Sequence, residues 1–273
     1  MADKLFDVTG KTVAITGGAG VLCGALARGL AERGAQVAVL DIGDEAAGQL
    51  TAEINAAGGE AHPVHCNVLQ KESVEQAFSE AVDKLGAIDV LVNGAGGNKK
   101  DATCVPPESL FFDLPAEATR WVFELNCLGT ILPSQVFGRH LAERGTGCII
   151  NVSSMNAFRP LTRIAGYSAA KAAVSNFTQW LAVHMSQNYS TKIRVNAIAP
   201  GFFLTDQNRF LLTNEDGSPT PRGQQIIDHT PMGRYGRPEE LLGTLVWLIS
   251  DAGKFVTGIV VPVDGGFSAY SGV

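Results

Sequence analysis

Short apolar runs alternate with longer segments whose apolar residues recur at helical spacing. Seven runs rich in β-branched residues are typical of buried strands, and they span residues 11–16, 36–40, 61–66, 88–92, 148–152, 192–198 and 259–263. Helices are expected between them, at about residues 21–33, 44–57, 71–85, 116–141, 167–187 and 238–250. Strands that alternate with helices indicate a parallel sheet covered on both faces. The sequence therefore predicts one α/β domain over residues 1–273, with a doubly wound parallel sheet of about seven strands.

The first strand runs into the glycine-rich turn Gly17-Gly18-Ala19-Gly20, and a helix follows that turn. In a Rossmann-type fold this arrangement places the pyrophosphate of a dinucleotide on the N-terminus of a helix. Asp41 ends the second strand, where a carboxylate would accept hydrogen bonds from the adenosine ribose and repel a 2′-phosphate. These residues predict a nicotinamide dinucleotide site that prefers NAD to NADP. An alternative role for Asp41 is to cap the helix that follows it.

A second group of polar residues lies around the strand at residues 148–152 and the helix after it. Ser154 follows the strand, and Tyr167 and Lys171 lie four residues apart on one face of an alanine-rich helix. A free phenol has a pKa of about 10, and a nearby positive charge favours its ionised form. We therefore expect Lys171 to lower the pKa of Tyr167 toward the range of general acid–base catalysis, with Ser154 holding a substrate oxygen. The alternative is an ordinary helix start with a solvated lysine, but the serine at this spacing favours catalysis.

Three further segments are expected to border the same site. The strand at residues 88–92 breaks into N-G-A-G, whose small residues would let a flat cofactor ring lie against the backbone. The alternative is that N-G-A-G forms only a tight turn, which would have the same composition. Residues 98–115 are polar and contain several prolines, as in a loop that covers a substrate. Residues 206–236 are rich in turn residues and are expected to form a mobile lid.

Asn126 interrupts the apolar spacing of the long helical segment at residues 116–141. A buried asparagine in a helix needs hydrogen-bond partners. We expect its amide to tie a chain of water molecules to Lys171, which would connect the catalytic group to solvent.

The bulk properties disfavour several classes of function. The chain carries a net charge of −6 and no basic run longer than Lys99-Lys100, which disfavours nucleic-acid binding. The charged N-terminus is unlike a signal peptide, and the apolar residues 241–249 are too few to cross a membrane. The five cysteines, an odd number without a C-x-x-C pair, are typical of reduced thiols in a cytoplasmic protein. No metal is expected, because the sequence contains no recognisable cluster of metal ligands.

The ordered motifs resemble the short-chain dehydrogenase/reductase family over essentially the full length of the chain. The matching pieces are Thr16-Gly17 with the glycine turn, Asn93-Gly94-Ala95-Gly96, Asn126, Ser154, Tyr167-x-x-x-Lys171, Pro200-Gly201 and Asp264-Gly265-Gly266. The resemblance implies that Tyr167 is the general acid or base, that Lys171 modifies its pKa and holds the nicotinamide ribose, and that Ser154 polarises the substrate carbonyl. It also implies that Asn126 anchors the proton-relay water and that Thr205 binds the nicotinamide carboxamide or a phosphate.

The cofactor-binding residues expected from the glycine turn and the family motifs lie at the ends of several strands. They are Gly17, Gly20, Val21, Leu22, Asp41, Asn67, Val68, Asn93, Ala95, Gly96, Tyr167, Lys171, Pro200, Gly201, Phe203 and Thr205. Two features depart from the family pattern. Val21 and Cys23 occupy the second and third glycine positions of the usual T-G-x-x-x-G-x-G turn, so the pyrophosphate contacts are expected to shift. Asn67 stands where an aspartate is frequent, and its carbonyl oxygen can still accept a hydrogen bond from the adenine amino group.

Several loop sequences, among them S-S-M-N-A-F and A-P-G-F-F-L-T, resemble the subgroup of D-mannonate oxidoreductases, which implies interconversion of D-mannonate and D-fructuronate. Cationic side chains on loops expected to border the cleft would suit a substrate carboxylate, namely Lys99, Lys100, Arg159, Arg163 and Arg209. Each of them could instead be a solvated surface charge. The expected substrate-binding residues are Asn98, Asn156 and Arg163.

Three functions stay open on the sequence alone. The first is an NAD-preferring sugar-acid oxidoreductase. The second is a reductase of the same fold for another keto-sugar, as in gluconate 5-dehydrogenases, or for an apolar carbonyl that the lid residues Phe202 and Leu211 would suit. The third is a non-catalytic dinucleotide-binding regulator, against which the intact catalytic residues argue. The resemblance also implies a homotetramer or a homodimer packed partly through the helices that hold Asn126 and Tyr167.

Overall fold

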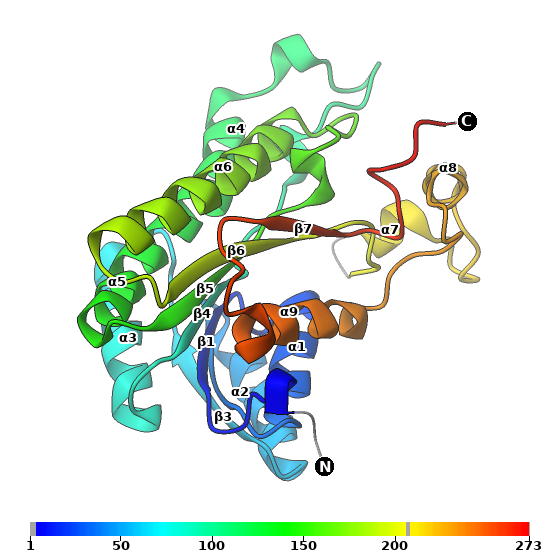
Figure 1. The fold of residues 1–273 in the computed structure, drawn as a ribbon. Coiled ribbons are helices and arrows are strands. Elements are labelled where there is room, and N and C mark those ends of the chain that lie inside the picture. Colours follow the sequence, from blue (N-terminus) through cyan, green and yellow to red (C-terminus); the bar gives the residue numbers. More distant parts are fainter. Residues whose placement is uncertain (1–3, 206–207, 273) are drawn as a thin grey trace.

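The computed structural model describes residues 4–205 and 208–272, and one parallel sheet organises them (Figure 1). The sheet has seven strands in the order β3-β2-β1-β4-β5-β6-β7. They are β1 Thr12–Thr16, β2 Gln36–Asp41, β3 Glu60–His65, β4 Val90–Asn93, β5 Gly147–Val152, β6 Ile193–Pro200 and β7 Val260–Val263. The prediction of a doubly wound parallel sheet in a single domain is confirmed, and every expected strand is present.

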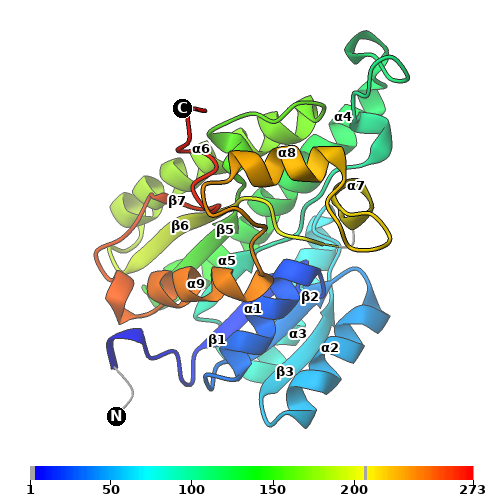
Figure 2. The same cartoon turned by 90° about the vertical axis from the view of Figure 1, so that its right-hand side faces the viewer.

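Helices cover both faces of the sheet (Figures 1 and 2). One face carries α1 Val21–Ala31, α2 Asp44–Ala56 and α9 Leu242–Ile249. The other face carries α3 Lys71–Leu85, α5 Gly129–Arg144 and α6 Ala165–Asn188. The remaining helices are α4 Ala116–Phe123, α7 Arg209–Leu212, α8 Pro221–His229 and the short 3₁₀ segments Lys4–Phe6, Lys100–Ala102, Phe111–Asp113, Met155–Ala157, Pro238–Leu241 and Asp251–Gly253.

The central strands are apolar on both faces because both of their faces are buried. All five residues of β1 are buried, as are the four central residues of β2 and of β5. Parallel strands between two helix layers need such continuous apolar runs, and this is the pattern that the sequence carries. On the α3–α5–α6 face, Phe137 is fully buried and packs edge-on against Phe78, with 5.2 Å between the ring centroids. Two separate hydrophobic cores therefore fix the sheet between its helices.

A chain of buried polar side chains crosses the middle of the sheet. The Asn93 amide on β4 donates hydrogen bonds to Ser134 Oγ and to Asn151 Oδ1, both at 2.9 Å. The Asn151 amide in turn donates to Thr178 Oγ1 at 2.9 Å. Buried amides are tolerated only when they are paired, so this chain ties β4 and β5 to α5 and α6 in one register.

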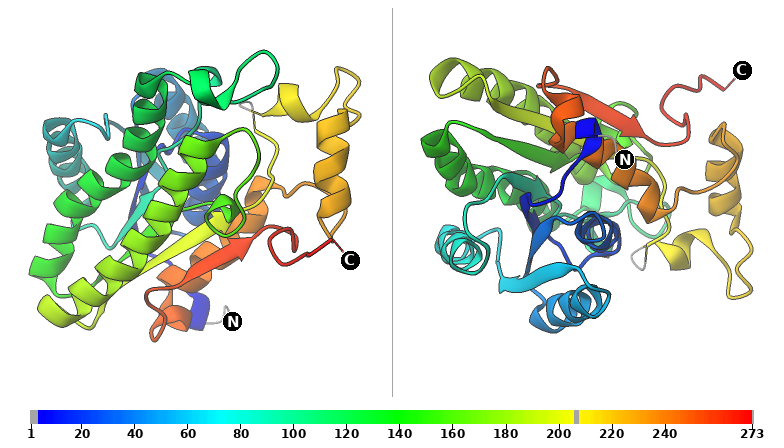
Figure 3. Two further views of the ribbon diagram at one scale, coloured as in Figure 1. Left: turned by 90° about the horizontal axis from the view of Figure 1, so that it is seen from above. Right: turned by 60° about the horizontal axis from the view of Figure 1, so that its bottom comes forward.

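The carboxyl ends of the strands form the edge at which a ligand would bind. β1 and β4 are neighbours, but the helices that follow them lie on opposite faces, α1 on one and α5 on the other. This topological switch opens a crevice beyond the carboxyl ends of the two strands. In both views of Figure 3, α8 (orange) lies beyond the arrowhead of β7 (red), on the same side as that crevice.

The structure differs from the expected helices in three places. The segment at residues 116–141 is interrupted by a π-helical turn at Glu124–Leu128. The expected helix at residues 238–250 begins as a 3₁₀ turn. The expected lid at residues 206–236 contains α8, which starts with Thr220 as N-cap and Pro221 as its first residue; residues 206–207 lie outside the described part. The helix was missed because the surrounding turn residues hid these two start signals.

Three further findings concern the whole described chain. No helix in residues 4–205 and 208–272 is long and apolar enough to span a bilayer. All five cysteines are free thiols. Within the same residues, no group of three or more histidine, cysteine or acidic side chains could hold a metal ion.

Candidate active site

The turns after β1 and β4 touch each other at the centre of the crevice. Gly17 has a φ of +61°, and a Cβ atom there would lie 2.7 Å from the Cα atom of Ala95. A Cβ atom on Gly18 would lie 2.8 Å from the carbonyl oxygen of Ile15. Only glycine fits these positions, because distances below 3 Å between such atoms are repulsive. The resulting cradle of bare backbone fits a dinucleotide that must lie close to the main chain.

Asp41 links this glycine turn to the start of α2. The amide of Ala19 donates to Asp41 Oδ2, and the amide of Gly43 donates to Asp41 Oδ1, each at 3.0 Å. The carboxylate therefore closes the turn before α2. It does not cap that helix, because the N-cap residue is Gly43 and no side chain caps it, so the capping alternative for Asp41 is wrong. It is also half-buried beside the crevice, where a ribose could lie against it. Of the two roles considered from the sequence, ribose binding stays a prediction.

The departures from the family glycine pattern have a structural compensation. Val21, the first residue of α1, is 38% exposed and fills no space that the turn needs. Cys23 is buried, and its sulfur occupies the position that a Cβ atom on Gly94 would take. Burial raises the pKa of the Cys23 thiol to about 12, so that it stays protonated. Gly94, in the turn after β4, therefore leaves the space that the side chain of Cys23 fills. Cys23 stands where the family pattern has its third glycine.

The expected adenine-side residues are held by local hydrogen bonds. Asn67 Oδ1 accepts from the main-chain amide of Leu69 at 3.1 Å, and the main-chain amide of Asn67 donates to Ser73 Oγ at 2.9 Å. Val68 is buried against Gly129, where a Cβ atom would lie 2.9 Å from Val68 Cγ2. These contacts hold Asn67 and Val68 in one position after β3, where an adenine ring could contact them. Leu22 is half-buried against the core of α1.

Asn93 is placed differently from the other expected cofactor residues. Its side chain is 1% exposed and belongs to the polar chain inside the sheet. Its Oδ1 atom is buried and has no hydrogen-bond partner among the described residues. A contact between Asn93 and a cofactor would therefore have to use the main chain.

The π-helical turn aims Asn126 at the loop after β4. The Asn126 amide donates to Val122 O and to Gly97 O, both at 2.7 Å, and Asn126 Oδ1 accepts from the amide of Gly97 at 3.1 Å. Thr130 Oγ1 donates to Asn126 O at 2.9 Å. These side-chain bonds satisfy carbonyl groups in the widened turn, which is a geometry frequently found at functional sites. The Asn126 side chain therefore fixes the main chain of Gly97 through both its N–H and its carbonyl group.

Lys171 reaches the same point from α6. Its side chain is 3% exposed, and its Nζ atom donates to Val152 O at 2.8 Å and lies 5.6 Å from the ring centroid of Tyr167. A Cβ atom on Gly96 would lie 2.6 Å from Asn126 Oδ1 and 3.2 Å from Lys171 Nζ. The structure thus brings Asn126, Lys171 and the backbone of Gly96 together, with Tyr167 adjacent.

The ionisation of the tyrosine and the lysine follows from their burial. Burial raises the pKa of Tyr167, and a side-chain hydrogen bond from Ser154 opposes this rise. Burial lowers the pKa of Lys171 to about 8. The expectation that the pKa of Tyr167 lies below its usual value is wrong for this structure. The ammonium group lies over the ring and donates to Val152 O, so that desolvation of the phenol dominates.

Asn156 connects Ser154 to the rest of the site. Its main-chain amide and its side-chain amide both donate to Ser154 Oγ, at 3.3 and 3.4 Å. Asn156 Oδ1 accepts from Ser168 Oγ at 3.3 Å and from the amide of Leu161 at 2.9 Å. Because the amide donates to the Ser154 oxygen, the serine hydroxyl is free to donate toward Tyr167 or a substrate oxygen.

A cavity of about 610 Å³ opens next to Asn156. Its wall combines polar groups with apolar ones, and among the lining residues are Asn156, Arg163, Ser168, Cys104 and Phe111. Two of the three expected substrate residues, Asn156 and Arg163, therefore line one cavity. The third does not line it: Asn98 donates to Thr103 Oγ1 at 2.9 Å, and its Oδ1 atom is buried without a described partner.

The end of β6 closes the opposite side of the crevice. A Cβ atom on Gly201 would lie 2.5 Å from the Cβ atom of Asp264, so the two turns after β6 and β7 require a glycine there. Phe203 is buried in the core and packs against Gly236, which leaves its main chain alone at the crevice. The amide of Thr205 donates to Asn208 Oδ1 at 2.8 Å. Pro200, Gly201 and Thr205 thus lie at or just beyond the carboxyl end of β6.

This fold and this group of side chains define a dinucleotide-dependent oxidoreductase, and the chain belongs to the short-chain dehydrogenase/reductase family. The family model described as enoyl-(acyl carrier protein) reductase matches residues 17–268. A Bacillus subtilis protein described as the uncharacterized oxidoreductase UxuB is 50% identical over 98% of both chains. The family assignment accounts for Ser154 and Lys171 lying next to Tyr167.

Two solved structures extend the comparison. The crystal structure of a proposed D-mannonate oxidoreductase from Haemophilus influenzae, with bound NAD, has a TM-score of 0.91 and 48% identity, and the alignment covers 98% of each chain. A gluconate 5-dehydrogenase from Burkholderia cenocepacia, in complex with NADP and tartrate, has a TM-score of 0.86 and 31% identity, again over 98% of each chain. The predicted resemblance to the family and to the D-mannonate oxidoreductase subgroup is confirmed.

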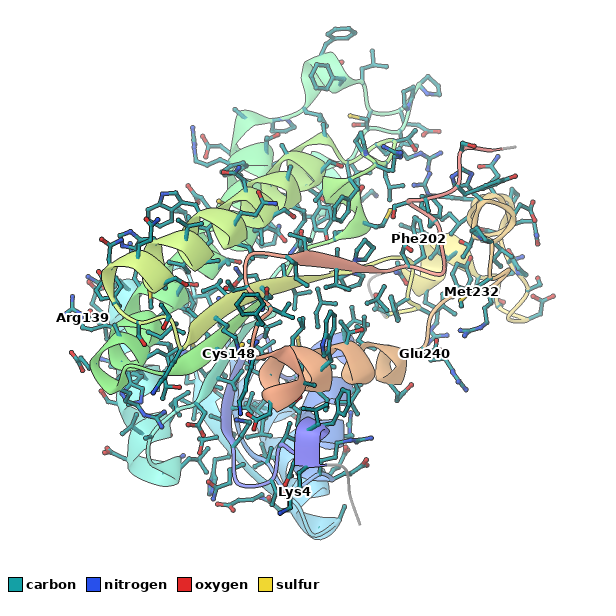
Figure 4. All side chains as sticks on the ribbon, viewed as in Figure 1. Lys4, Arg139, Cys148, Phe202, Met232 and Glu240 are labelled. Carbon is teal, nitrogen blue, oxygen red and sulfur yellow. The ribbon has the colours of Figure 1, made fainter. Side chains whose placement is uncertain are left out.

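One residue beside the site was missed from the sequence. Arg222 lies in the first turn of α8 and lines a second cavity of about 260 Å³ together with Phe202 and His229. Figure 4 shows Phe202 at the end of the sheet that faces this helix, whereas Cys148 lies toward the opposite end near α9. Recognising Thr220-Pro221 as a helix start would have placed Arg222 on an ordered element.

We expect Gly96→Ala to abolish cofactor turnover while the protein still folds. The added methyl group would displace Asn126 Oδ1 or Lys171 Nζ, and a displacement of about 1 Å in an active site can lower the rate about 100-fold. Turnover by the purified variant, with circular dichroism as the check on folding, is the measurement. The matched control is Gly48→Ala in α2, where open space surrounds the position and activity should be unchanged. Full activity of Gly96→Ala would show that the close contact is unimportant.

Proposed function

We propose that the protein is an NAD-dependent oxidoreductase that interconverts a sugar-acid carbonyl and its alcohol, with D-fructuronate and D-mannonate as the preferred pair. The observation that carries this proposal is a cavity lined by Asn156, whose main-chain and side-chain amides donate to Ser154 Oγ, and by Arg163. It offers an amide for hydroxyl groups and a guanidinium group for a carboxylate. The 48% identity to a proposed D-mannonate oxidoreductase with bound NAD supports the same substrate pair.

The glycine turn, Asp41, Lys171 and Thr205 would hold the cofactor, and the bound nicotinamide supplies hydride exchange with the substrate carbon. The phenol of Tyr167 gives a proton to the carbonyl oxygen in reduction and takes it back in oxidation. The hydroxyl of Ser154 donates a hydrogen bond to the same oxygen and stabilises its developing negative charge. Lys171 contributes a positive charge that favours the tyrosinate, and Asn126 fixes the loop that faces both groups.

The preference for NAD rests on Asp41. Its carboxylate lies between the amides of Ala19 and Gly43, where a 2′-phosphate would meet a negative charge. The related Haemophilus influenzae structure contains NAD, whereas the more distant Burkholderia cenocepacia enzyme contains NADP. A carboxylate at the end of β2 favours the first of these two cofactors.

A second sugar acid is the alternative substrate. The Burkholderia cenocepacia gluconate 5-dehydrogenase is 31% identical over nearly the whole chain, which favours a 5-keto acid such as 5-keto-D-gluconate. The similarity to a proposed D-mannonate oxidoreductase and to a gluconate 5-dehydrogenase supports a sugar acid over an apolar carbonyl. A non-catalytic regulator would not need Ser154, Tyr167 and Lys171 together.

The protein is further proposed to be a homotetramer or a homodimer that packs through the helix layer holding Asn126 and Tyr167. Large apolar side chains are exposed along these helices, with Trp180 and Val183 each 57% exposed and Leu128 42% exposed. Exposed apolar residues in one area are typical of a protein–protein interface.

A substrate panel tests the proposed activity. We expect D-fructuronate to give the highest kcat/KM in NADH oxidation, above 5-keto-D-gluconate, D-fructose and an apolar cyclic ketone. Tyr167→Phe should lower turnover about 100-fold or more, since general acid catalysis contributes about that much, while NADH still binds. Absorbance of NADH measures turnover and its fluorescence measures binding. NADH binding without turnover of any sugar acid would favour a regulator.

A substitution that removes one negative charge tests the cofactor preference. Asp41→Asn keeps an oxygen that can accept a hydrogen bond but removes the negative charge, so the preference for NAD over NADP should fall about tenfold or more. The measurement is kcat/KM for each cofactor. Asp44→Asn removes the same charge three residues away and serves as the control. Unchanged selectivity in Asp41→Asn would mean that another group excludes the 2′-phosphate.

A charge on the exposed helix face tests the proposed assembly. Trp180→Glu would bury a carboxylate in the interface, which is unfavourable, so the mass in solution should fall. Size-exclusion chromatography with light scattering gives that mass. Ala52→Glu places the same charge on α2, away from this layer, and should leave the mass unchanged. An unaltered mass for Trp180→Glu would remove this face from the assembly.

A further inference from the structure

The buried side chain of Asn156 connects Ser154 to the loop before α6. Asn156 lies in the 3₁₀ turn Met155–Ala157, and Ser154 precedes this turn as its N-cap residue. The main-chain amide of Asn156 donates to Ser154 Oγ at 3.3 Å, and its side-chain Nδ2 donates to the same oxygen at 3.4 Å. One residue therefore directs two N–H groups at the serine oxygen.

The oxygen of the Asn156 side chain fixes the orientation of its amide group. Asn156 Oδ1 accepts from the main-chain amide of Leu161 at 2.9 Å and from Ser168 Oγ at 3.3 Å. A main-chain N–H can only donate, so the atom that faces Leu161 must be the oxygen. Turning the amide by half a rotation would set two N–H donors against each other. The Nδ2 atom therefore has to face Ser154.

The two N–H donors of Asn156 occupy both lone pairs of Ser154 Oγ. A serine hydroxyl has two acceptor lone pairs and one hydrogen, so this hydroxyl can only donate to Tyr167 and cannot accept from it. A hydrogen bond donated to the phenol oxygen favours the tyrosinate, whereas a bond accepted from the phenol favours its neutral form. Burial raises the pKa of Tyr167 and the hydrogen bond from Ser154 lowers it, which agrees with donation by the serine.

We propose that Asn156 is a positioning residue that restricts Ser154 to hydrogen-bond donation, so that the serine hydrogen points to Tyr167 or to the reacting oxygen of the substrate. This inference rests on the proposed function, because it assumes that Ser154 and Tyr167 carry the proton transfer. In oxidation the donated bond stabilises the tyrosinate that acts as the base. In reduction it stabilises the negative charge that develops on the substrate oxygen. The second N–H of the Asn156 side chain is left for a ligand in the 610 Å³ cavity.

The neighbouring polar side chains are engaged elsewhere. Ser153 Oγ donates to Lys171 O at 3.1 Å, and Lys171 Nζ donates to Val152 O at 2.8 Å. Within residues 4–205 and 208–272, both hydrogen bonds that Ser154 Oγ accepts come from Asn156. The direction of the serine hydroxyl therefore depends on this one residue.

Two substitutions test this role through the pKa of Tyr167, measured by ¹³C-tyrosine NMR in the protein without substrate. Asn156→Leu removes the side-chain donor and frees a lone pair of Ser154, to which the neutral phenol can then donate, so the pKa of Tyr167 should rise. Asn156→Asp keeps an oxygen that accepts from Leu161 and Ser168, which preserves the local fold. The pKa should rise further in this variant, because the serine hydroxyl turns to the carboxylate and the negative charge disfavours the tyrosinate.

A double-variant cycle separates positioning from folding. In Ser154→Ala the group through which Asn156 acts is absent, so adding Asn156→Leu should leave the pKa of Tyr167 where Ser154→Ala alone puts it. A merely structural role of Asn156 would move that pKa equally in both backgrounds. Asn188→Leu makes the same exchange at an exposed position at the end of α6 and should leave the pKa of Tyr167 unchanged.

The pH profile of turnover gives a second readout. In D-mannonate oxidation with NAD the tyrosinate is the base, so the pH at which kcat rises should move upward in Asn156→Leu together with the pKa of Tyr167. At neutral pH, kcat should fall about tenfold, since one hydrogen bond contributes about that much.

Each outcome decides between the two proposals. If the pKa of Tyr167 is the same in the wild type, Asn156→Leu and Asn156→Asp, or if Asn156→Leu shifts it equally with and without Ser154, the positioning role is refuted. If sugar acids are turned over while that pKa stays unchanged, the positioning role fails and the proposed function stands. If the cycle behaves as expected but the wild type turns over no sugar acid, Asn156 keeps its role toward Ser154 and the proposed function fails.

Discussion

The backbone of Gly96 lies between the amide of Asn126 and the ammonium group of Lys171, and the active site depends on this contact. Without a side chain at Gly96, the loop after β4 can approach both groups closely. The π-helical turn brings Asn126 into reach, and the long helix α6 brings Lys171. Two buried polar groups are thereby aimed at one crevice at the carboxyl ends of the strands, where ligands of doubly wound sheets bind.

Burial then sets the chemistry of these groups. An ammonium group in a dry site has a pKa of about 8, far below that of an exposed lysine, and a phenol in the same site is harder to ionise. The hydrogen bond from Ser154 opposes the second effect. The site therefore holds a neutral tyrosine that can give a proton to a carbonyl oxygen, and a nearby charge that stabilises the tyrosinate left behind.

The sequence predicted the sheet well because the central strands are buried on both faces and are therefore continuous apolar runs. Ser154, Tyr167 and Lys171 were predictable from spacing alone. The sequence did not predict how Cys23 fits, because its space is provided by Gly94, a residue far away in the chain. The sequence did not place Arg222 beside Phe202, because the start of α8 at Thr220 and Pro221 lies within a segment of turn residues. The direction of the Tyr167 pKa was wrong because desolvation depends on packing.

The central claim is that the charge of Lys171 makes the phenol of Tyr167 a usable proton carrier. The most direct measurement is the pKa of Tyr167 in the NAD complex, from ¹³C-tyrosine NMR, with its signal assigned by its loss in Tyr167→Phe. The account predicts a clearly higher pKa in Lys171→Met than in the wild type, since the positive charge that favours the tyrosinate is gone. The same pKa in both proteins would contradict it.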